Sequence, residues 1–94
     1  MTFYISGPIS KNKNFTEDFE RARKRLRNLG VSVLNPVDYA LLNPGKSWEH
    51  YMRHDLCSLA MADGIYMLKG WRRSKGAKLE YKIAKALNLE ILYE

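Results

Sequence analysis

The stretch Gly64-Ile65-Tyr66-Met67-Leu68 is a short run of uncharged, mostly apolar residues. Such a run is typical of a strand that is buried on both faces of a parallel sheet. Three similar runs occur along the chain: Phe3-Tyr4-Ile5-Ser6, Val31-Ser32-Val33-Leu34 and Leu89-Glu90-Ile91-Leu92-Tyr93. The turn-forming pairs Gly7-Pro8 and Asn35-Pro36 follow the first two of them. The sequence therefore predicts four strands.

Segments with helical periodicity separate these strands. The first shows apolar residues at spacings of four and three, at Phe15, Phe19, Ala22, Leu26 and Leu29. This stripe predicts a helix that ends at Gly30, with Asn14 as its N-cap and Glu17 completing a capping box. A second helix is expected from Trp48, capped by Ser47, to about Met61. A third is expected from about Ser74 to Leu87, whereas residues 35–46 are expected to form a loop.

The alternation of strands and helices predicts right-handed crossovers and a parallel sheet between helical layers. We expect an α/β protein with one domain over residues 1–94. Its fold would be a flavodoxin- or Rossmann-like three-layer fold with a four-stranded parallel sheet of order 2-1-3-4. In such sheets ligands bind at the carboxyl ends of the strands beside the point where the order reverses. Loops 7–13 and 69–75 would meet there, and they carry Lys11, Lys13, Lys69, Arg72, Arg73 and Lys75.

Composition excludes several classes of protein. The chain of 94 residues is long enough for one modest core, and its 46% hydrophobic and 28% charged residues exclude disorder, collagen and coiled coil. The single Cys57 excludes a disulfide framework and a cysteine zinc site. His50 and His54 lie four residues apart without a third ligand, so we expect no metal and no cofactor. No signal peptide and no run of about 18 apolar residues is present, which favours a soluble, cytoplasmic protein.

The net charge of +6 favours an anionic partner, because 16 Lys and Arg face only 10 Asp and Glu. Nucleic acid, a phosphorylated small molecule and an acidic surface all fit this excess. A merely solubilising surface is the alternative. Charge alone does not decide among them.

Two carboxylates fall on the apolar faces of their predicted helices. Asp55 lies in the middle of the face formed by Trp48, Tyr51, Met52, Leu56 and Leu59, and Glu80 in that of Ala77, Ile83, Ala84 and Leu87. A buried carboxylate is unfavourable unless it is paired, hydrogen-bonded or protonated. The structural explanation is an ion pair or a cap, of Asp55 with Arg53 or His54 and of Glu80 with a nearby lysine. The functional explanation is a pair of acids in a dry pocket, one nucleophile and one proton donor, with shifted pKa values.

Other residues near the expected ligand site fit the functional explanation. Tyr4 lies in the first predicted strand, where its hydroxyl would orient a carboxylate, although simple packing is the commoner role of a buried tyrosine. The Gly7-Pro8-Ile9 turn frees backbone N–H groups before a helix. Ser74 and Gly76 offer a second anion-binding position at the start of the third helix.

Three motifs together resemble the nucleoside 2-deoxyribosyltransferase superfamily. They are Tyr4-Ile5-Ser6-Gly7-Pro8-Ile9, Arg53-His54-Asp55-Leu56-Cys57-Ser58-Leu59 followed by Ala62-Asp63, and Ser74-Lys75-Gly76-Ala77-Lys78-Leu79-Glu80. The resemblance covers nearly the whole chain. It is greatest to small uncharacterised members found in phage genomes and to the 2'-deoxynucleoside 5'-monophosphate N-glycosidases.

The resemblance implies a role for each motif residue. Glu80 corresponds to the nucleophile that attacks C1' of the sugar, Tyr4 to the residue that orients it, and Asp55 to the acid at the nucleobase. Ser74 corresponds to a phosphate-binding serine of the monophosphate hydrolases. Pro8 stands where those hydrolases carry a second such serine, so Ser6, Ser10 or loop N–H groups would replace it. The remaining expected substrate contacts are Gly7, Ile9, Gly76 and Arg72.

The resemblance thus implies a hydrolase of the N-glycosidic bond of a (deoxy)nucleoside 5'-monophosphate that acts as a homodimer or higher homo-oligomer. The expected cytoplasm would be that of a phage-infected bacterial host. The alternatives are a non-catalytic module that binds or senses a nucleotide or an ADP-ribose-type ligand, and a nucleoside deoxyribosyltransferase. Nucleic-acid binding through the first helix and Trp71-Arg72-Arg73 is less favoured. The acidic residues Glu17, Asp18 and Glu20 interrupt the basic helix.

Overall fold

The computed structural model describes residues 1–94 and contains one sheet of four parallel strands. The strands are β1 (Thr2–Ser6), β2 (Ser32–Leu34), β3 (Gly64–Met67) and β4 (Glu90–Tyr93). Their order is β2-β1-β3-β4, and every neighbouring pair is parallel. The α/β class and the strand order expected from the sequence are therefore confirmed.

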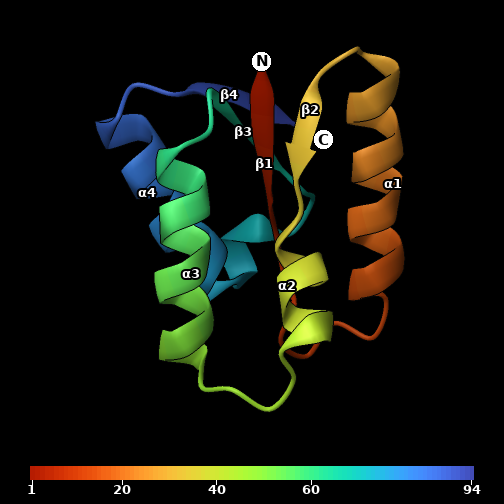
Figure 1. The fold of residues 1–94 in the computed structure, drawn as a ribbon, viewed down its shortest axis with the longest axis vertical. Coiled ribbons are helices and arrows are strands. Elements are labelled where there is room, and N and C mark those ends of the chain that lie inside the picture. The colour runs from red at the N-terminus through yellow and green to blue at the C-terminus, as the bar shows by residue number, and fades with distance from the viewer.

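Helices cover both faces of this sheet. They are α1 (Phe15–Asn28), α2 (Pro36–Leu42), α3 (Trp48–Ala60) and α4 (Lys75–Ala86), with a short 3₁₀ helix η1 (Trp71–Arg73) before α4. Figure 1 shows α1 on one side of the sheet and α3 with α4 on the other. The three layers expected for this fold are present.

Each face of the sheet has its own hydrophobic core. The core under α1 consists of Phe3, Ile5, Phe19, Ala22, Leu26, Val37, Tyr66 and Leu68. The core under α3 and α4 consists of Tyr4, Leu59, Ala62, Ile65, Met67, Trp71, Ala77 and Ala84. Successive residues of a strand point to opposite faces. Phe3 and Ile5 therefore face α1, and Tyr4 and Ser6 face the same side as α4, which carries Glu80.

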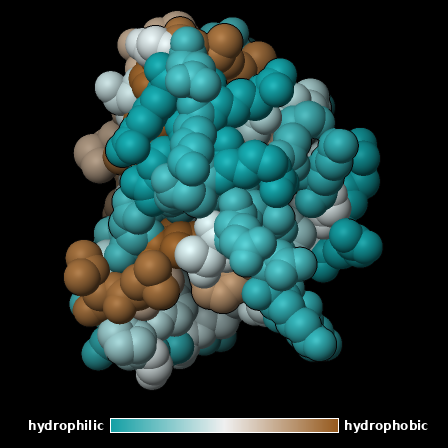
Figure 2. Space-filling model, turned by 90° about the vertical axis from the view of Figure 1, so that its right-hand side faces the viewer, coloured by the Kyte–Doolittle hydropathy of each residue, from teal (hydrophilic) through white to brown (hydrophobic).

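The outer surface over α1 is largely hydrophilic (Figure 2). Hydrophobic side chains gather only towards its upper and lower ends, and the lower group lies at the height at which Figure 1 places α2. Leu41 and Leu42 of α2 are exposed. Helix α2 thus leaves apolar side chains exposed to solvent.

Helix α2 replaces part of the loop expected over residues 35–46. The Asn35 side chain accepts a hydrogen bond from Val37 N at 3.0 Å, and Pro36 occupies the first helical turn. Asp38 adds an acidic side chain to that turn. These are ordinary helix-start signals. They stand in a segment of only seven helical residues, too short for a hydrophobic period to show.

Three smaller expectations about the helices were wrong. The Asn14 side chain makes no capping hydrogen bond, and instead the Asn14 N–H donates to Oδ1 of Asn12 at 3.0 Å. Leu29 and Leu87, assigned to apolar stripes, are exposed. Each lies at the C-cap, one residue beyond its helix, where the chain already turns away from the core.

Gly64 permits close packing between two neighbouring strands. It pairs with Phe3 in the β1–β3 register, and a Cβ atom at position 64 would lie 2.6 Å from Cζ of Phe3 and closer still to Cε2. We expect Gly64→Ala to lower the free energy of unfolding by about 1–3 kcal/mol, because the ring must move within a packed core. Urea denaturation measures this change. Ser32→Ala, at an exposed position of β2, is the control, and equal stability of the two variants would contradict the packing argument.

Candidate active site

A cavity of about 450 Å³ opens at the carboxyl end of β1. This volume lies within the range typical of small-molecule sites. Its walls come from β1 and the loop after it, from α1, from α2 and the loop after it, from α3, and from the first half of α4. It includes seven of the residues assigned to the site from the sequence: Tyr4, Gly7, Ile9, Asp55, Ser74, Gly76 and Glu80.

Both carboxylate oxygens of Glu80 are held by hydroxyl groups of β1. The Tyr4 hydroxyl donates to Oε2 at 2.5 Å, and the Ser6 hydroxyl donates to Oε1 at 2.6 Å. The Glu80 residue is only 5% exposed. No lysine or arginine forms an ion pair with it, so the ion pair considered from the sequence is absent.

Burial dominates the protonation of Glu80. It raises the pKa of this carboxyl to about 7, against the lowering effect of the hydrogen bonds from Ser6 and Tyr4, and the negative charge of Asp55 raises it further. The pKa of Tyr4 is itself raised well above its usual value, chiefly by burial and then by the charges of Glu80 and Asp55. Tyr4 therefore remains a hydrogen-bond donor, and Glu80 exchanges its proton near neutral pH.

Asp55 reaches the cavity from α3 and is 7% exposed. Burial raises its pKa, whereas the neighbouring His54 lowers it. Nδ1 of His54 lies 3.3 Å from Oδ1 of Asp55, so one of the two partners considered from the sequence is present. The His54 ring is stacked on Tyr39, with 3.5 Å between ring centroids. A carboxyl with a raised pKa, held at the cavity wall, is suited to proton donation.

The start of α4 supplies groups that bind anions. The Ser74 hydroxyl oxygen accepts a hydrogen bond from Ala77 N at 3.1 Å, which leaves its proton free to donate. The first N–H groups of a helix have no partner within it. Gly76 lies among these positions, and a Cβ atom there would approach Sδ of Met52 to 3.2 Å. Glycine therefore keeps this part of the cavity open beside the helix N-terminus.

Two other expected contact residues are placed differently. Ser6 is 1% exposed, does not line the cavity, and uses its hydroxyl for Glu80. Arg72 lies away from the cavity, with its guanidinium carbon 4.7 Å from the centroid of the Trp71 ring. It lines a second cavity of about 320 Å³. Because Trp71 packs into the core, the exposed residues after it point outward.

The expected cluster of basic residues is absent from the main cavity wall. None of the six lysines and arginines of loops 7–13 and 69–75 lines it. The basic residue that does so is Lys46, in the loop after α2. Ala40 and Leu41 of α2 also contribute, together with Ser10. The helix-start signals at Asn35-Pro36 would have indicated this wall, whereas no pattern singles out Lys46.

The fold and the cavity define a Rossmann-like α/β protein with a site at the strand ends. The chain belongs to the family described as a domain of unknown function, DUF4406, which matches residues 1–93. No curated protein matches the sequence. A 2-deoxyribosyltransferase from the psychrotolerant bacterium Bacillus psychrosaccharolyticus has a similar structure, with a TM-score of 0.79 and 20% sequence identity. The match covers 99% of this chain and 71% of that chain, and it confirms the expected resemblance for the fold.

Two further features concern metal ligands and membrane-spanning helices. No group of three or more His, Cys, Asp or Glu side chains is arranged to hold a metal ion. None of the helices has the length and apolar character needed to cross a bilayer.

Proposed function

We propose that this protein hydrolyses the N-glycosidic bond of a (deoxy)nucleoside 5'-monophosphate, with Glu80 as the nucleophile. The observation that carries the proposal is the buried Glu80 carboxylate at the cavity wall, held by Tyr4 and Ser6 without a cation. An ionised carboxylate that is buried without a cation lowers the stability of the fold even when it is hydrogen-bonded, which favours a functional role for Glu80 over a structural one. Here two hydroxyl donors favour the ionised form of Glu80, and the residue lines the cavity.

The first chemical step forms a glycosyl-enzyme intermediate. A Glu80 oxygen attacks C1' of the sugar, the bond from C1' to the base nitrogen breaks, and its electron pair leaves with the base. Asp55 donates a proton to the departing base, which is a poor leaving group when unprotonated. A well-placed acid contributes about 10²–10⁴-fold to such a step.

The second step releases the sugar phosphate. A water molecule attacks C1', the bond between C1' and the Glu80 oxygen breaks, and Asp55 takes the proton of the water. The retaining mechanism of glycosidases uses two carboxyl groups in the same two roles. The proton given by Asp55 in the first step is thereby restored.

The start of α4 would hold the 5'-phosphate. The Ser74 hydroxyl and the N–H groups near Gly76 offer hydrogen-bond donors, and the helix dipole favours a negative charge at this end. Gly7 and Ile9 line the cavity from the loop after β1, and Lys46 adds a positive charge from the loop after α2. These groups support a phosphorylated substrate over a free nucleoside.

Base release from a panel of nucleoside and deoxynucleoside 5'-monophosphates tests the proposal. We expect the wild type to release free base, measured by chromatography, and Glu80→Gln to be slower by about 10³-fold or more, as for loss of a nucleophile. Glu90→Gln, at an exposed position of β4, is the matched control and should behave as wild type. Equal background release by wild type and Glu80→Gln would refute the proposal.

A deoxyribosyltransferase is the second candidate, and the likeness to a 2-deoxyribosyltransferase structure favours it. The two reactions share the first step, but in the transferase a second base replaces water as the acceptor. Adding a different free base to the same assay separates them. A new nucleotide would indicate transfer, and sugar phosphate would indicate hydrolysis.

A further inference from the structure

The outer face of α4 carries a row of cationic side chains. Lys75, Lys78, Lys82 and Lys85 are separated by three, four and three residues, which places them on one side of the helix. Arg72 and Arg73 of η1 precede them, and all six side chains are exposed. The one acidic residue between positions 72 and 85 is Glu80, on the buried side. We call these six residues the α4 basic face.

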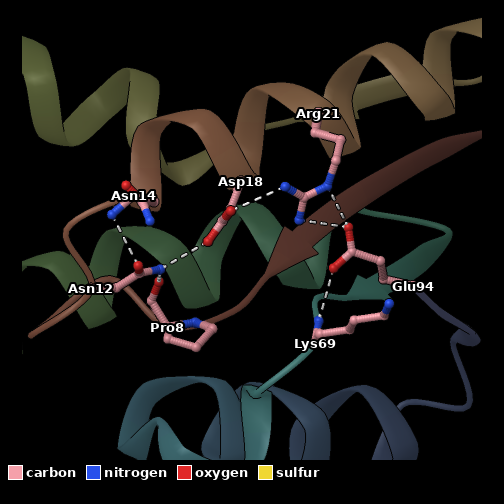
Figure 3. A network of polar contacts seen from close by, with 7 residues as sticks. All are labelled: Pro8, Asn12, Asn14, Asp18, Arg21, Lys69 and Glu94. Atoms are coloured by element: carbon pink, nitrogen blue, oxygen red, sulfur yellow. Dashed lines mark hydrogen bonds and ion pairs between the residues drawn. The ribbon is translucent and has the colours of Figure 1, made fainter.

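The charge of the α4 basic face is not compensated within the molecule. None of its six residues forms an ion pair. On α1, by contrast, Arg21 lies between Asp18 and Glu94, at 3.0 and 2.8 Å (Figure 3). Arg23 of the same helix pairs with Glu20 and Asp38. Two of the five basic residues of α1 are thus paired with carboxylates, whereas none of the six residues of the α4 basic face is.

The lysines of the α4 basic face begin beside the main cavity. The Lys75 ammonium lies 4.1 Å from the centroid of the Trp48 ring, and Trp48 lines the cavity beside Ser74 and Gly76. From Lys75 to Lys85 the row extends over about 15 Å of helix. A ligand whose negative charge begins at Ser74 therefore meets further positive charge along α4.

We infer that the α4 basic face binds the phosphate backbone of a single-stranded nucleic acid whose 3'-terminal nucleotide enters the cavity. The direction of the strand rests on the proposed function, which places a 5'-phosphate at the start of α4. In a polynucleotide this phosphate joins the terminal nucleoside to the preceding nucleotide. The preceding phosphates then follow Lys75, Lys78, Lys82 and Lys85.

Two features favour a nucleic acid over other polyanions. The row adjoins a cavity of nucleotide size, and an exposed tyrosine, Tyr93, lies beside α4 with its hydroxyl 3.1 Å from that of Tyr81. Exposed aromatic rings beside a basic groove are typical of single-strand binding, because bases stack on them. The acidic residues that argue against nucleic acid on α1 have no counterpart on the α4 basic face.

Fluorescence anisotropy with a short, labelled single-stranded DNA tests the inference. We expect the double variant Lys78→Glu/Lys82→Glu to bind at least about 10-fold more weakly than wild type. The matched control is Lys24→Glu/Arg27→Glu, which makes the same charge change at exposed positions of α1. For the wild type, log K should fall with log salt concentration with a slope of about −3 to −4, as four to six backbone contacts predict.

Each outcome decides one question. Equal loss of binding in both double variants would overturn the inference, because the charge effect would then be nonspecific. Tighter binding to phosphatidylserine vesicles or to polyglutamate than to DNA would also overturn it.

The direction of the strand has its own test. A bulky group at the 3' end of the DNA should weaken binding more than the same group at the 5' end, and the reverse result would overturn the proposed strand direction. If wild type releases no base from mononucleotides while binding still depends on α4, the proposed function fails and the nucleic-acid surface stands.

Discussion

The free energy of unfolding of Glu80→Gln is expected to exceed that of wild type at about pH 8, and most of this advantage is expected to be lost at about pH 5. The pKa of the buried carboxyl is raised from 4.5 to about 7, so the folded chain holds this proton over a range in which the unfolded chain has released it. Stability from this group is therefore present at low pH and is lost as the pH rises through the folded pKa. The shift in the pKa of Glu80 corresponds to a difference in free energy of unfolding of about 3 kcal/mol at most.

Glutamine resembles the protonated carboxyl in shape and in the hydrogen bonds that it can make to Tyr4 and Ser6. Urea denaturation at the two pH values measures the effect, with Glu90→Gln as a control that should follow wild type at both. A Glu80→Gln variant less stable than wild type at about pH 8 would contradict this account. A variant that gains stability while losing base release would show that the buried charge is kept for function rather than for the fold.

Tyr4→Phe is expected to slow base release at neutral pH by about 10–100-fold, the loss typical of a hydrogen bond to a charged group. The variant removes one of the two donors to Glu80, and this hydrogen bond lowers the pKa of the carboxyl. Without it the pKa of Glu80 rises, so a larger share of Glu80 is protonated and cannot act as the proposed nucleophile. The acidic limb of the pH–rate profile should therefore move to higher pH.

Tyr66→Phe provides the matched control for this experiment. Its hydroxyl lies in the buried interior of the other core without a hydrogen-bond partner, so removing it breaks no interaction with Glu80. The pH–rate profile of Tyr66→Phe should coincide with that of wild type. A Tyr4→Phe profile that coincides with that of wild type would show that Tyr4 only packs, which was the alternative considered from the sequence.

The strands could be predicted because their signal is local. A run such as residues 64–68 needs no partner to be read as a buried strand, and the alternation of strands with helices leaves few topologies. Helix α2 is different: its capping signals at Asn35-Pro36 are clear, but its seven residues are too few to show a period. The cap at Asn14 depends on where Asn12 points, and that is decided by the fold of the loop.

The two buried acids could also be predicted, because an acid on an apolar helix face contradicts the pattern around it. The contacts made around these acids could not be predicted from the sequence. Ser6 was expected at a phosphate, but the strand register places its hydroxyl against Glu80. Arg72 was expected at the same anion, but burial of Trp71 directs the residues after it elsewhere. Such placements depend on long-range packing, which no short motif records.

The two hydroxyl donors to Glu80 belong to β1, which is paired with a neighbouring strand on each side. The Glu80 carboxylate is thus hydrogen-bonded to an interior strand of the sheet, whereas α2 and the loop after it line the cavity from outside the sheet. Changes in those outer segments would alter which molecule is accepted without disturbing the chemistry. The same framework is therefore suited to diversification, because the reaction proposed for Glu80 would be kept while the entrance to the cavity changes.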